Sequence, residues 1–339
     1  MHLDSLRLER WKEQGRRTAQ TLERRSIRQI LSESAQPGVV ILGDPGSGKT
    51  TLLHYLALRA ARQPGDDPSS RLPIFVPLAA FDDYLRRSGA ASASLGDFFA
   101  IYYDQWRSLP GLGPLFQQAL AAGRALVLLD GLDEVLDRTT RQFVTEQAGA
   151  LIQQWMPRGN RFALTSRIVG YRAARLPGNL PHVTVLDFGR AEIELFAQQW
   201  TIAYETWAAG RATPTALQQA AAERQGLLQD VHSNPSVERL AVNPLLLTIL
   251  ALMKRQGVLL PERRVQLYEQ YVQTLLRHWN LSRGLDRRSI RDLDLLETVR
   301  VLAPLALWMQ ETSPGAGLVK RGEVQRHLQA IYQERGAAD

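Results

Sequence analysis

The amino-acid sequence predicts an α/β fold with a parallel sheet covered by helices on both faces, followed by an all-α region. Short apolar runs typical of buried strands alternate with helical stretches in the first half of the chain. A glycine-rich loop joins one of these strands to a helix. After Leu186 the strand pattern stops and only helical periodicity remains, so we expect a domain boundary there.

The elements of the first half follow from these patterns. Leu3 to Leu31 is charged with spaced apolar positions and is predicted to be a helix that leads into the sheet. Five strands are predicted at residues 39–42, 74–78, 125–129, 162–165 and 183–186. Helices are predicted at residues 50–62, as a pair within 95–122, and at 139–155.

The second half is predicted to be entirely helical. Its helices are expected at residues 191–209, 214–232, 237–256, 261–283, 290–311 and 321–334. Gly257 and Pro261 divide this half in two. The predicted organisation is a helical lead-in, an α/β domain and two helical parts, at residues 1–36, 37–187, 188–257 and 258–339.

Composition limits the class of protein. A chain of 339 residues with 45% hydrophobic residues is long enough for two or three globular domains. It has no cysteine, which excludes disulfides and thiolate metal sites. Residues 1–17 are polar and lack a signal core, and the longest apolar stretch, residues 244–253, is too short to cross a bilayer. We therefore expect a cytoplasmic protein with no membrane partner.

The net charge of +7 comes from arginine, since only four of the 41 basic residues are lysine. An arginine excess is compatible with nucleic-acid binding and also with solvated helix faces. No arginine cluster is interleaved with aromatic residues as in a stacking platform. Nucleic acid is therefore a possible partner that the sequence does not favour.

The loop after the first strand fits the pattern G-x-x-x-x-G-K-[ST] at every fixed position. Its glycines allow the backbone to approach a ligand, and its N–H groups and the following helix N-terminus attract phosphate. Lys49 is predicted to contact the β- and γ-phosphates and Thr50 to bind Mg²⁺. The predicted nucleotide-binding residues of this loop are Gly43, Asp44, Pro45, Gly46, Ser47, Gly48, Lys49, Thr50 and Thr51.

A second apolar strand ends in the carboxylates Asp130, Asp133 and Glu134. Ligands of open α/β sheets bind at the carboxyl ends of the strands, so these side chains are expected to face the phosphate loop. Asp130 is predicted to hold Mg²⁺, through water. Glu134 is predicted to polarise the attacking water, with Asp133 assisting either role.

A third apolar strand ends in Thr165, Ser166 and Arg167. We expect Thr165 to sense the γ-phosphate or the water, and Arg167 to pair with phosphate oxygens. The predicted catalytic residues are therefore Glu134, Asp133, Lys49 and Arg167.

Together these motifs resemble the NACHT family of STAND-type P-loop ATPases, in particular its bacterial members. The resemblance rests on the loop at 43–51, LPIFVPL at 72–78, LLDGLDE at 128–134, LTSRIVGY at 164–171, NPLLLT at 243–248 and RRVQLYEQYV at 263–272. It implies an ASCE-type nucleotide-binding domain with a parallel five-stranded sheet, an all-α helical domain, and a winged-helix domain truncated at its end. It also implies that Pro244 contacts adenine.

The resemblance further implies a function. NACHT proteins are switches that ADP holds closed and that exchange to ATP opens, with homo-oligomerisation on activation. Bacterial relatives take part in antiphage defence. The chain leaves no room for effector or sensor domains, so we expect a core fragment of a longer protein. The family's winged-helix histidine has no counterpart here, because the surroundings of His327 do not match.

Two other functions remain open at this stage. One is a mechanical ATPase of the AAA+ kind, which needs an arginine finger such as Arg158 and turns over fast. The other is a STAND transcription regulator whose helical half contacts DNA with strong salt dependence. Slow turnover with tightly held ADP favours the switch over both.

Overall fold

The computed structural model describes residues 8–10, 26–32, 37–62, 70–88, 93–135, 137–257, 265–266, 268–273, 276, 295–313, 319 and 321–336. The described chain divides into two compact units. The first contains residues up to 186 together with 313–319, and the second contains residues 187–312 and 320–339.

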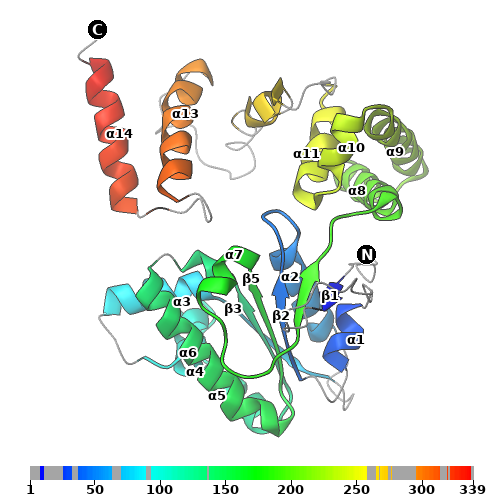
Figure 1. Ribbon diagram of the computed structural model, residues 1–339. Coiled ribbons are helices and arrows are strands. Elements are labelled where there is room, and N and C mark those ends of the chain that lie inside the picture. The colour runs from blue at the N-terminus through cyan, green and yellow to red at the C-terminus, as the bar shows by residue number, and fades with distance from the viewer. Residues whose placement is uncertain are drawn as a thin grey trace, which may run out of the picture. The chain divides into compact units, whose positions relative to one another are not determined.

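A sheet of six strands forms the centre of the first unit (Figure 1). Its strand order is β1-β6-β2-β5-β4-β3, and five of the strands are parallel. The five parallel strands are those predicted: β2 Gly38–Leu42, β3 Leu72–Pro77, β4 Ala125–Asp130, β5 Arg161–Ser166 and β6 His182–Val185. Strands β2, β4 and β5 are almost fully buried, and apart from Arg161 and the polar residues that end β4 and β5 they are apolar, as expected for a sheet covered on both faces.

The sheet has a sixth strand that corrects the prediction for the N-terminal segment. Residues 3–31 were expected to be helical, but Leu8–Arg10 form strand β1, which pairs antiparallel with β6. A free edge strand offers unpaired N–H and C=O groups, and a short antiparallel strand satisfies them regardless of helical periodicity. Within the described residues, the helix of this segment is confined to α1, Ile27–Ser32.

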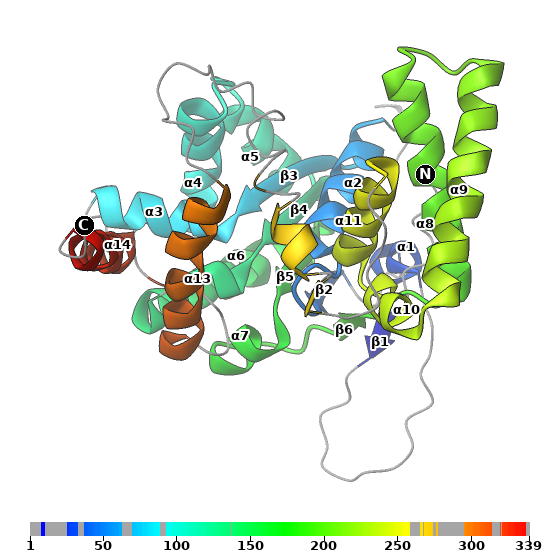
Figure 2. The ribbon, with the colours of Figure 1, turned by 90° about the horizontal axis from the view of Figure 1, so that it is seen from above.

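Helices cover both faces of the sheet (Figure 2). One face packs on α1 and α2 Lys49–Ala61, whose Leu52, Leu53 and Leu56 are buried. The other face packs on α3 Leu78–Ser88, α4 Leu95–Ile101, α5 Gly113–Ala121 and α6 Arg138–Trp155. A π-helical turn, Tyr102–Trp106, extends α4, and α4 and α5 form the predicted helix pair.

Two helices of this unit were not predicted. Helix α3 follows β3 directly and carries an amphipathic pattern in which Leu78 and Phe81 are buried. Helix α7, Ile168–Ala173, follows Arg167 and has only six residues. Helix α3 begins at the end of β3, where the apolar run of the strand merges into the first turn of the helix and hides the change of period. Helix α7 is too short to show a helical period of its own.

The end of the sheet opposite the phosphate loop is fixed by Asn160, which is fully buried. Its Oδ1 accepts a hydrogen bond from Ala125 N at 2.9 Å. Its Nδ2 donates to Leu120 O and to Trp155 O, each at 2.8 Å. One side chain therefore joins the ends of α5 and α6 to the start of β4.

The second unit begins with four helices: α8 Arg190–Ala208, α9 Pro214–Ser233, α10 Pro235–Ala241 and α11 Pro244–Arg255. A single helix was predicted across residues 237–256, and the structure divides it into α10 and α11. The division is due to Asn243, whose Oδ1 accepts hydrogen bonds from Leu245 N and Leu246 N and so caps α11. Pro244 takes the first helical position, where a missing N–H costs nothing.

The C-terminal region contains α13 Leu295–Thr312 and α14 Arg321–Gly336, close to the predicted helices. Of the helix predicted at residues 261–283, the described residues 265–266, 268–273 and 276 are helical, and the remainder lies outside the described residues. The winged-helix assignment stays a prediction. Among the residues described, none of the helices combines the length and apolar character of a membrane span.

Replacing Asn160 with Ala is expected to lower the free energy of unfolding by about 3 kcal/mol, because two buried backbone groups and one partly buried group lose their partner. Urea unfolding of the whole chain, followed by circular dichroism, measures the change. Gln142→Ala on the exposed face of α6 is the control and should change stability by less than about 0.5 kcal/mol. Equal effects of the two changes would contradict the role of Asn160.

Candidate functional site

Three strand ends meet at one edge of the sheet. Strand β5 lies between β2 and β4 and is parallel to both. The phosphate loop follows β2, Asp130 ends β4, and Thr165 and Ser166 end β5. The three predicted motifs, which are spread over residues 43–167 of the sequence, are therefore neighbours. This is the edge at which open α/β sheets bind ligands.

The phosphate loop depends on its glycines. Gly46 and Gly48 have φ of 77° and 89°, a left-handed conformation that other residues rarely adopt. Gly48 is the N-cap of α2, so the first free N–H groups of the helix lie directly beside the loop. A Cβ on Gly43 would lie 2.7 Å from Oγ of the buried Ser47, so a side chain there would force Ser47 to move.

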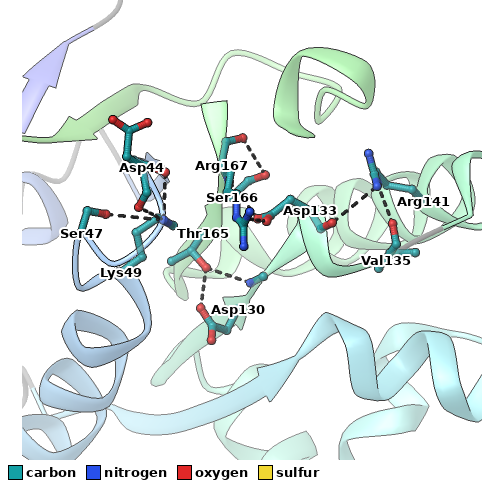
Figure 3. Close-up of polar contacts among 12 residues, drawn as sticks. Asp44, Ser47, Lys49, Asp130, Asp133, Val135, Arg141, Thr165, Ser166 and Arg167 are labelled. Atoms are coloured by element: carbon teal, nitrogen blue, oxygen red, sulfur yellow. Dashed lines mark hydrogen bonds and ion pairs between the residues drawn. The ribbon is translucent and has the colours of Figure 1, made fainter. Parts of the chain in front are cut away.

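Lys49 is held by the loop itself (Figure 3). Its Nζ donates to Gly43 O and Asp44 O, each at 2.9 Å, and lies 3.5 Å from Ser47 Oγ. Burial lowers the pKa of Lys49, opposed by Asp133 and reinforced by Arg167. The ammonium therefore lies in the middle of the loop, bonded to carbonyl oxygens that a phosphate oxygen can replace.

Asp130 is held by Thr165. The Thr165 hydroxyl donates to Asp130 Oδ1 at 2.5 Å and accepts from Gly131 N at 2.9 Å. Thr165 was expected to sense the γ-phosphate or the water, but in this structure its hydroxyl fixes the carboxylate of the neighbouring strand. Both residues are buried, so this geometry is determined by the sheet and not by solvent.

Asp133 and Arg167 form an ion pair with two contacts. Asp133 Oδ1 accepts from the backbone N–H of Arg167 at 2.8 Å, and Oδ2 lies 3.0 Å from Arg167 Nε. Asp133 is buried, whereas the Arg167 side chain keeps 29% of its surface exposed. Both oxygens of Asp133 are thus used by Arg167, which favours a positioning role for Asp133 over a role as base.

Glu134 extends back over Gly131. Gly131 has φ of 74°, and a Cβ on it would lie 2.9 Å from Glu134 Cδ. Although Glu134 is exposed overall, desolvation of its carboxyl by the surrounding chain raises its pKa, and Asp130 and Asp133 raise it further. Arg167 and Lys49 act in the opposite direction. The carboxyl therefore lies among all the other charges of the site.

Two residues that the sequence did not single out support the acidic segment. Arg141 of α6 donates from Nε to Val135 O at 2.8 Å and from Nη2 to Asp133 O at 3.5 Å. A Cβ on Gly170 of α7 would lie 2.4 Å from Asp133 Cβ, so the two backbones touch. The glycine within LTSRIVGY is the signal that sequence analysis missed, because its partner is distant in the chain.

The residues predicted to hold Mg²⁺ are compatible with that ion. Thr50 is exposed beside the loop, and Oδ2 of Asp130 has no hydrogen-bond partner among the described residues. Within that part of the chain, no group of three or more His, Cys, Asp or Glu side chains forms a metal site. Mg²⁺ typically takes one or two protein ligands and completes its shell with phosphate and water, so this donor set fits.

The structure brings the predicted site residues of the first unit together. Lys49 interacts electrostatically with Asp130, Asp133 and Arg167, and Glu134 interacts with all four. Asp44, Pro45, Thr50 and Thr51 form the exposed side of the phosphate loop. Pro244 belongs to the second unit, where it starts α11, and its predicted contact with adenine stays a prediction.

Comparison with known proteins identifies the part of the chain that carries the site. Residues 38–204 match the NACHT domain family. This part of the chain is a NACHT domain, a nucleotide-binding P-loop NTPase module. The match covers all five parallel strands and ends within α8. No curated protein sequence matches the chain.

Solved structures resemble this chain only in coarse outline. A DNA replication initiation factor has a TM-score of 0.36 at 11% identity, covering 91% of this chain and 85% of that chain. AMPPCP-bound DnaA from Aquifex aeolicus has a TM-score of 0.36 at 10% identity, covering 91% and 86%. PCH-2 of C. elegans has a TM-score of 0.31 at 14% identity, covering 90% and 62%. At these TM-scores the likeness says nothing about function.

The raised pKa of Glu134 makes a prediction about stability. The native state binds this proton more tightly than the unfolded chain, whose carboxyl has its ordinary pKa near 4.5. The nucleotide-free protein therefore loses stability as the pH rises from that value through the native pKa. Glu134→Gln should be more stable than the wild type at pH 7, by less than about 1 kcal/mol because solvent screens the site.

Urea unfolding at pH 7 and at pH 4 measures this difference, which should be absent at the lower pH. Glu146→Gln, on the exposed face of α6, is the matched control and should match the wild type at both pH values. A Glu134→Gln protein that is less stable at pH 7 would contradict the electrostatic account.

Proposed function

We propose that the protein is a slow, Mg²⁺-dependent ATPase that acts as a conformational signalling switch. The observation that carries the proposal is the bonding of both phosphate-site cations to the chain's own oxygens. Lys49 is bonded to Gly43 O and Asp44 O, and Arg167 to Asp133. A nucleotide phosphate competes with these oxygens for the two cations. Its binding therefore changes the contacts of Lys49, which follows β2, and of Arg167, which follows β5.

The chemistry divides among the residues at the strand ends. Lys49 and the loop N–H groups bind the β- and γ-phosphates, and Arg167 neutralises charge that develops on the γ-phosphoryl group. Glu134 orients the attacking water and accepts its proton, a role that suits a carboxyl of raised pKa among cations. Thr50 and Asp130 would hold Mg²⁺, which supplies charge neutralisation of the phosphates when bound.

The Asp133–Arg167 pair supports a switch over a fast enzyme. Arg167 reaches the γ-phosphate only by shifting its guanidinium away from a buried carboxylate. Breaking a buried ion pair is costly unless a new anion replaces the lost partner. Arg167 therefore has two arrangements, one paired with Asp133 and one paired with the γ-phosphate. Because only ATP carries a γ-phosphate, the balance between them distinguishes ATP from ADP.

Other parts of the proposal rest on membership in the NACHT group. Adenine recognition by Pro244, homo-oligomerisation on activation and a role in antiphage defence are what this membership implies. A cytoplasmic location is part of the same proposal and agrees with the absence of cysteine.

Lys49→Ala is expected to weaken ATP and ADP binding at least about a hundredfold, because the phosphates lose their central charge-assisted contact. Isothermal titration calorimetry on the whole chain measures this loss. Lys254→Ala is the matched control, since Lys254 pairs with Asp230 in the second unit. Unchanged affinity of Lys49→Ala for both nucleotides would refute the site.

Glu134→Gln is expected to bind ATP with unchanged affinity and to release phosphate at least about a hundredfold more slowly, because the water loses its base. The wild type should turn over below about once per minute, far under the typical enzyme range. Phosphate release under single-turnover conditions measures the hydrolysis rates of the wild type and of Glu134→Gln. Fast turnover stimulated by nucleic acid or protein would contradict the switch, and undiminished hydrolysis by Glu134→Gln would contradict its role as base.

A further inference from the structure

The Asp133–Arg167 pair is supported by α7 at two points. Arg167 is the N-cap of α7, and its backbone N–H donates to Asp133 Oδ1. One turn later, Gly170 lies so close to Asp133 that a Cβ would come within 2.4 Å of the Asp133 Cβ. The position of α7 therefore determines where the pair lies.

Helix α7 is too short to hold this position alone. A helix of six residues gains little from its own hydrogen bonds, so tertiary contacts must fix it. The residue after Gly170 is Tyr171, which is buried in the main core of the sheet with 4% of its surface exposed. Tyr171 is therefore the core anchor of the helix that holds the pair.

The Tyr171 hydroxyl has two partners outside α7. It accepts a hydrogen bond from Leu176 N at 3.3 Å, in the connection that follows the helix. It also lies 2.8 Å from His182 Nε2, and the two rings are in contact with centroids 5.1 Å apart. Burial lowers the pKa of His182, and Arg175 lowers it further, so the neutral imidazole can accept from the hydroxyl at Nε2.

His182 is the first residue of β6 and links this contact to the phosphate loop. It lies opposite Val40 of β2, the strand that leads into the loop. Val40 N also donates to Pro181 O at 2.9 Å. Strand β6 ends at Val185, directly before the second unit begins. The hydroxyl of Tyr171 thus connects α7 to the strand that adjoins β2.

We propose that Tyr171 is a positioning residue for Arg167, the arginine proposed to bind the γ-phosphate. The Tyr171 hydroxyl fixes α7 to strand β6, and α7 holds the Asp133–Arg167 pair through Gly170. The inference rests on the proposed ATPase function and adds a residue to it. Tyr171 does not touch the nucleotide in this scheme. It acts by keeping Arg167 where it can exchange Asp133 for a phosphate oxygen.

The test compares two tyrosines that lose the same atom. Tyr171→Phe removes the hydroxyl that links α7 to β6. Tyr103→Phe removes a hydroxyl that bonds Phe75 N and Phe75 O at 3.1 Å and 3.0 Å, on the strand at the other edge of the sheet. Both changes remove two hydrogen bonds, so a purely structural effect would be similar in the two variants.

Tyr171→Phe is expected to lower kcat about tenfold, because a small misplacement of Arg167 weakens contacts made in the transition state. Its affinity for ATP should stay within about twofold of the wild type, since Lys49 and the loop are unchanged. Tyr103→Phe should keep kcat within about twofold of the wild type. Equal kcat losses in the two variants, or no loss in Tyr171→Phe, would overturn the proposal.

Hydrogen exchange provides a readout that does not depend on turnover. The Arg167 amide is bonded to Asp133, so Tyr171→Phe should exchange this amide at least about tenfold faster, whereas Tyr103→Phe should leave it unchanged. Wild-type protein without any ATP turnover would refute the proposed function, while the exchange result would still decide the role of Tyr171. Unchanged exchange in Tyr171→Phe overturns that role.

Gly170→Ala is the second variant and decides the outcome where Tyr171→Phe does not fold. Its added Cβ forces Asp133 and α7 apart while both partners of the Tyr171 hydroxyl remain. Lower kcat and faster Arg167 exchange in Gly170→Ala support the linkage. Wild-type kcat and exchange in Gly170→Ala contradict it.

Discussion

The placement of β5 between β2 and β4 is the constraint on which the site depends. Because all three strands are parallel, their carboxyl ends lie at one edge of the sheet. Only this order puts the end of β5 beside both the phosphate loop and the acidic segment. The Thr165 hydroxyl then reaches Asp130, and the Arg167 backbone reaches Asp133. A different strand order would leave the same residues on the same strands without a common site.

The site contains several charges that compensate one another in the absence of phosphate. Two cations, Lys49 and Arg167, lie among the carboxylates of Asp130, Asp133 and Glu134. Lys49 bonds loop carbonyls and Arg167 bonds Asp133, so the positive charges have partners that are themselves part of the chain. Among the described residues Glu134 forms no ion pair, and desolvation, together with Asp130 and Asp133, raises the pKa of its carboxyl. Asp133 and Glu134 therefore differ in their contacts. Asp133 is paired with Arg167 and acts as a positioning carboxylate, whereas Glu134 is the candidate base.

Sequence patterns predicted the sheet well and the short elements poorly. The five parallel strands are continuous apolar runs, and burial on both faces makes such runs easy to recognise. Strand β1 was wrongly expected to be helical, because its pairing with β6 is a tertiary event. Helix α3 was missed because it continues directly from β3, and α7 was missed because six residues are too few to show a helical period. The break between α10 and α11 was missed because apolar residues run through it, although the cap by Asn243 followed by Pro244 is a recognisable helix start.

The sequence by itself determined which residues could bind phosphate and where the acidic and basic strand ends lie. That information is local, because the φ angles of a glycine loop and the apolar run of a buried strand both depend on a few consecutive residues. The tertiary structure decided which contacts each of these residues makes and therefore which role it has. Only the fold shows that Thr165 bonds to Asp130 and that Asp133 pairs with Arg167. Only the fold shows that Gly170 packs α7 against Asp133 and that Tyr171 bonds α7 to His182 of β6. These contacts join residues 11 to 37 positions apart, and their geometry depends on strand order and helix placement, which periodicity and motif spacing do not encode.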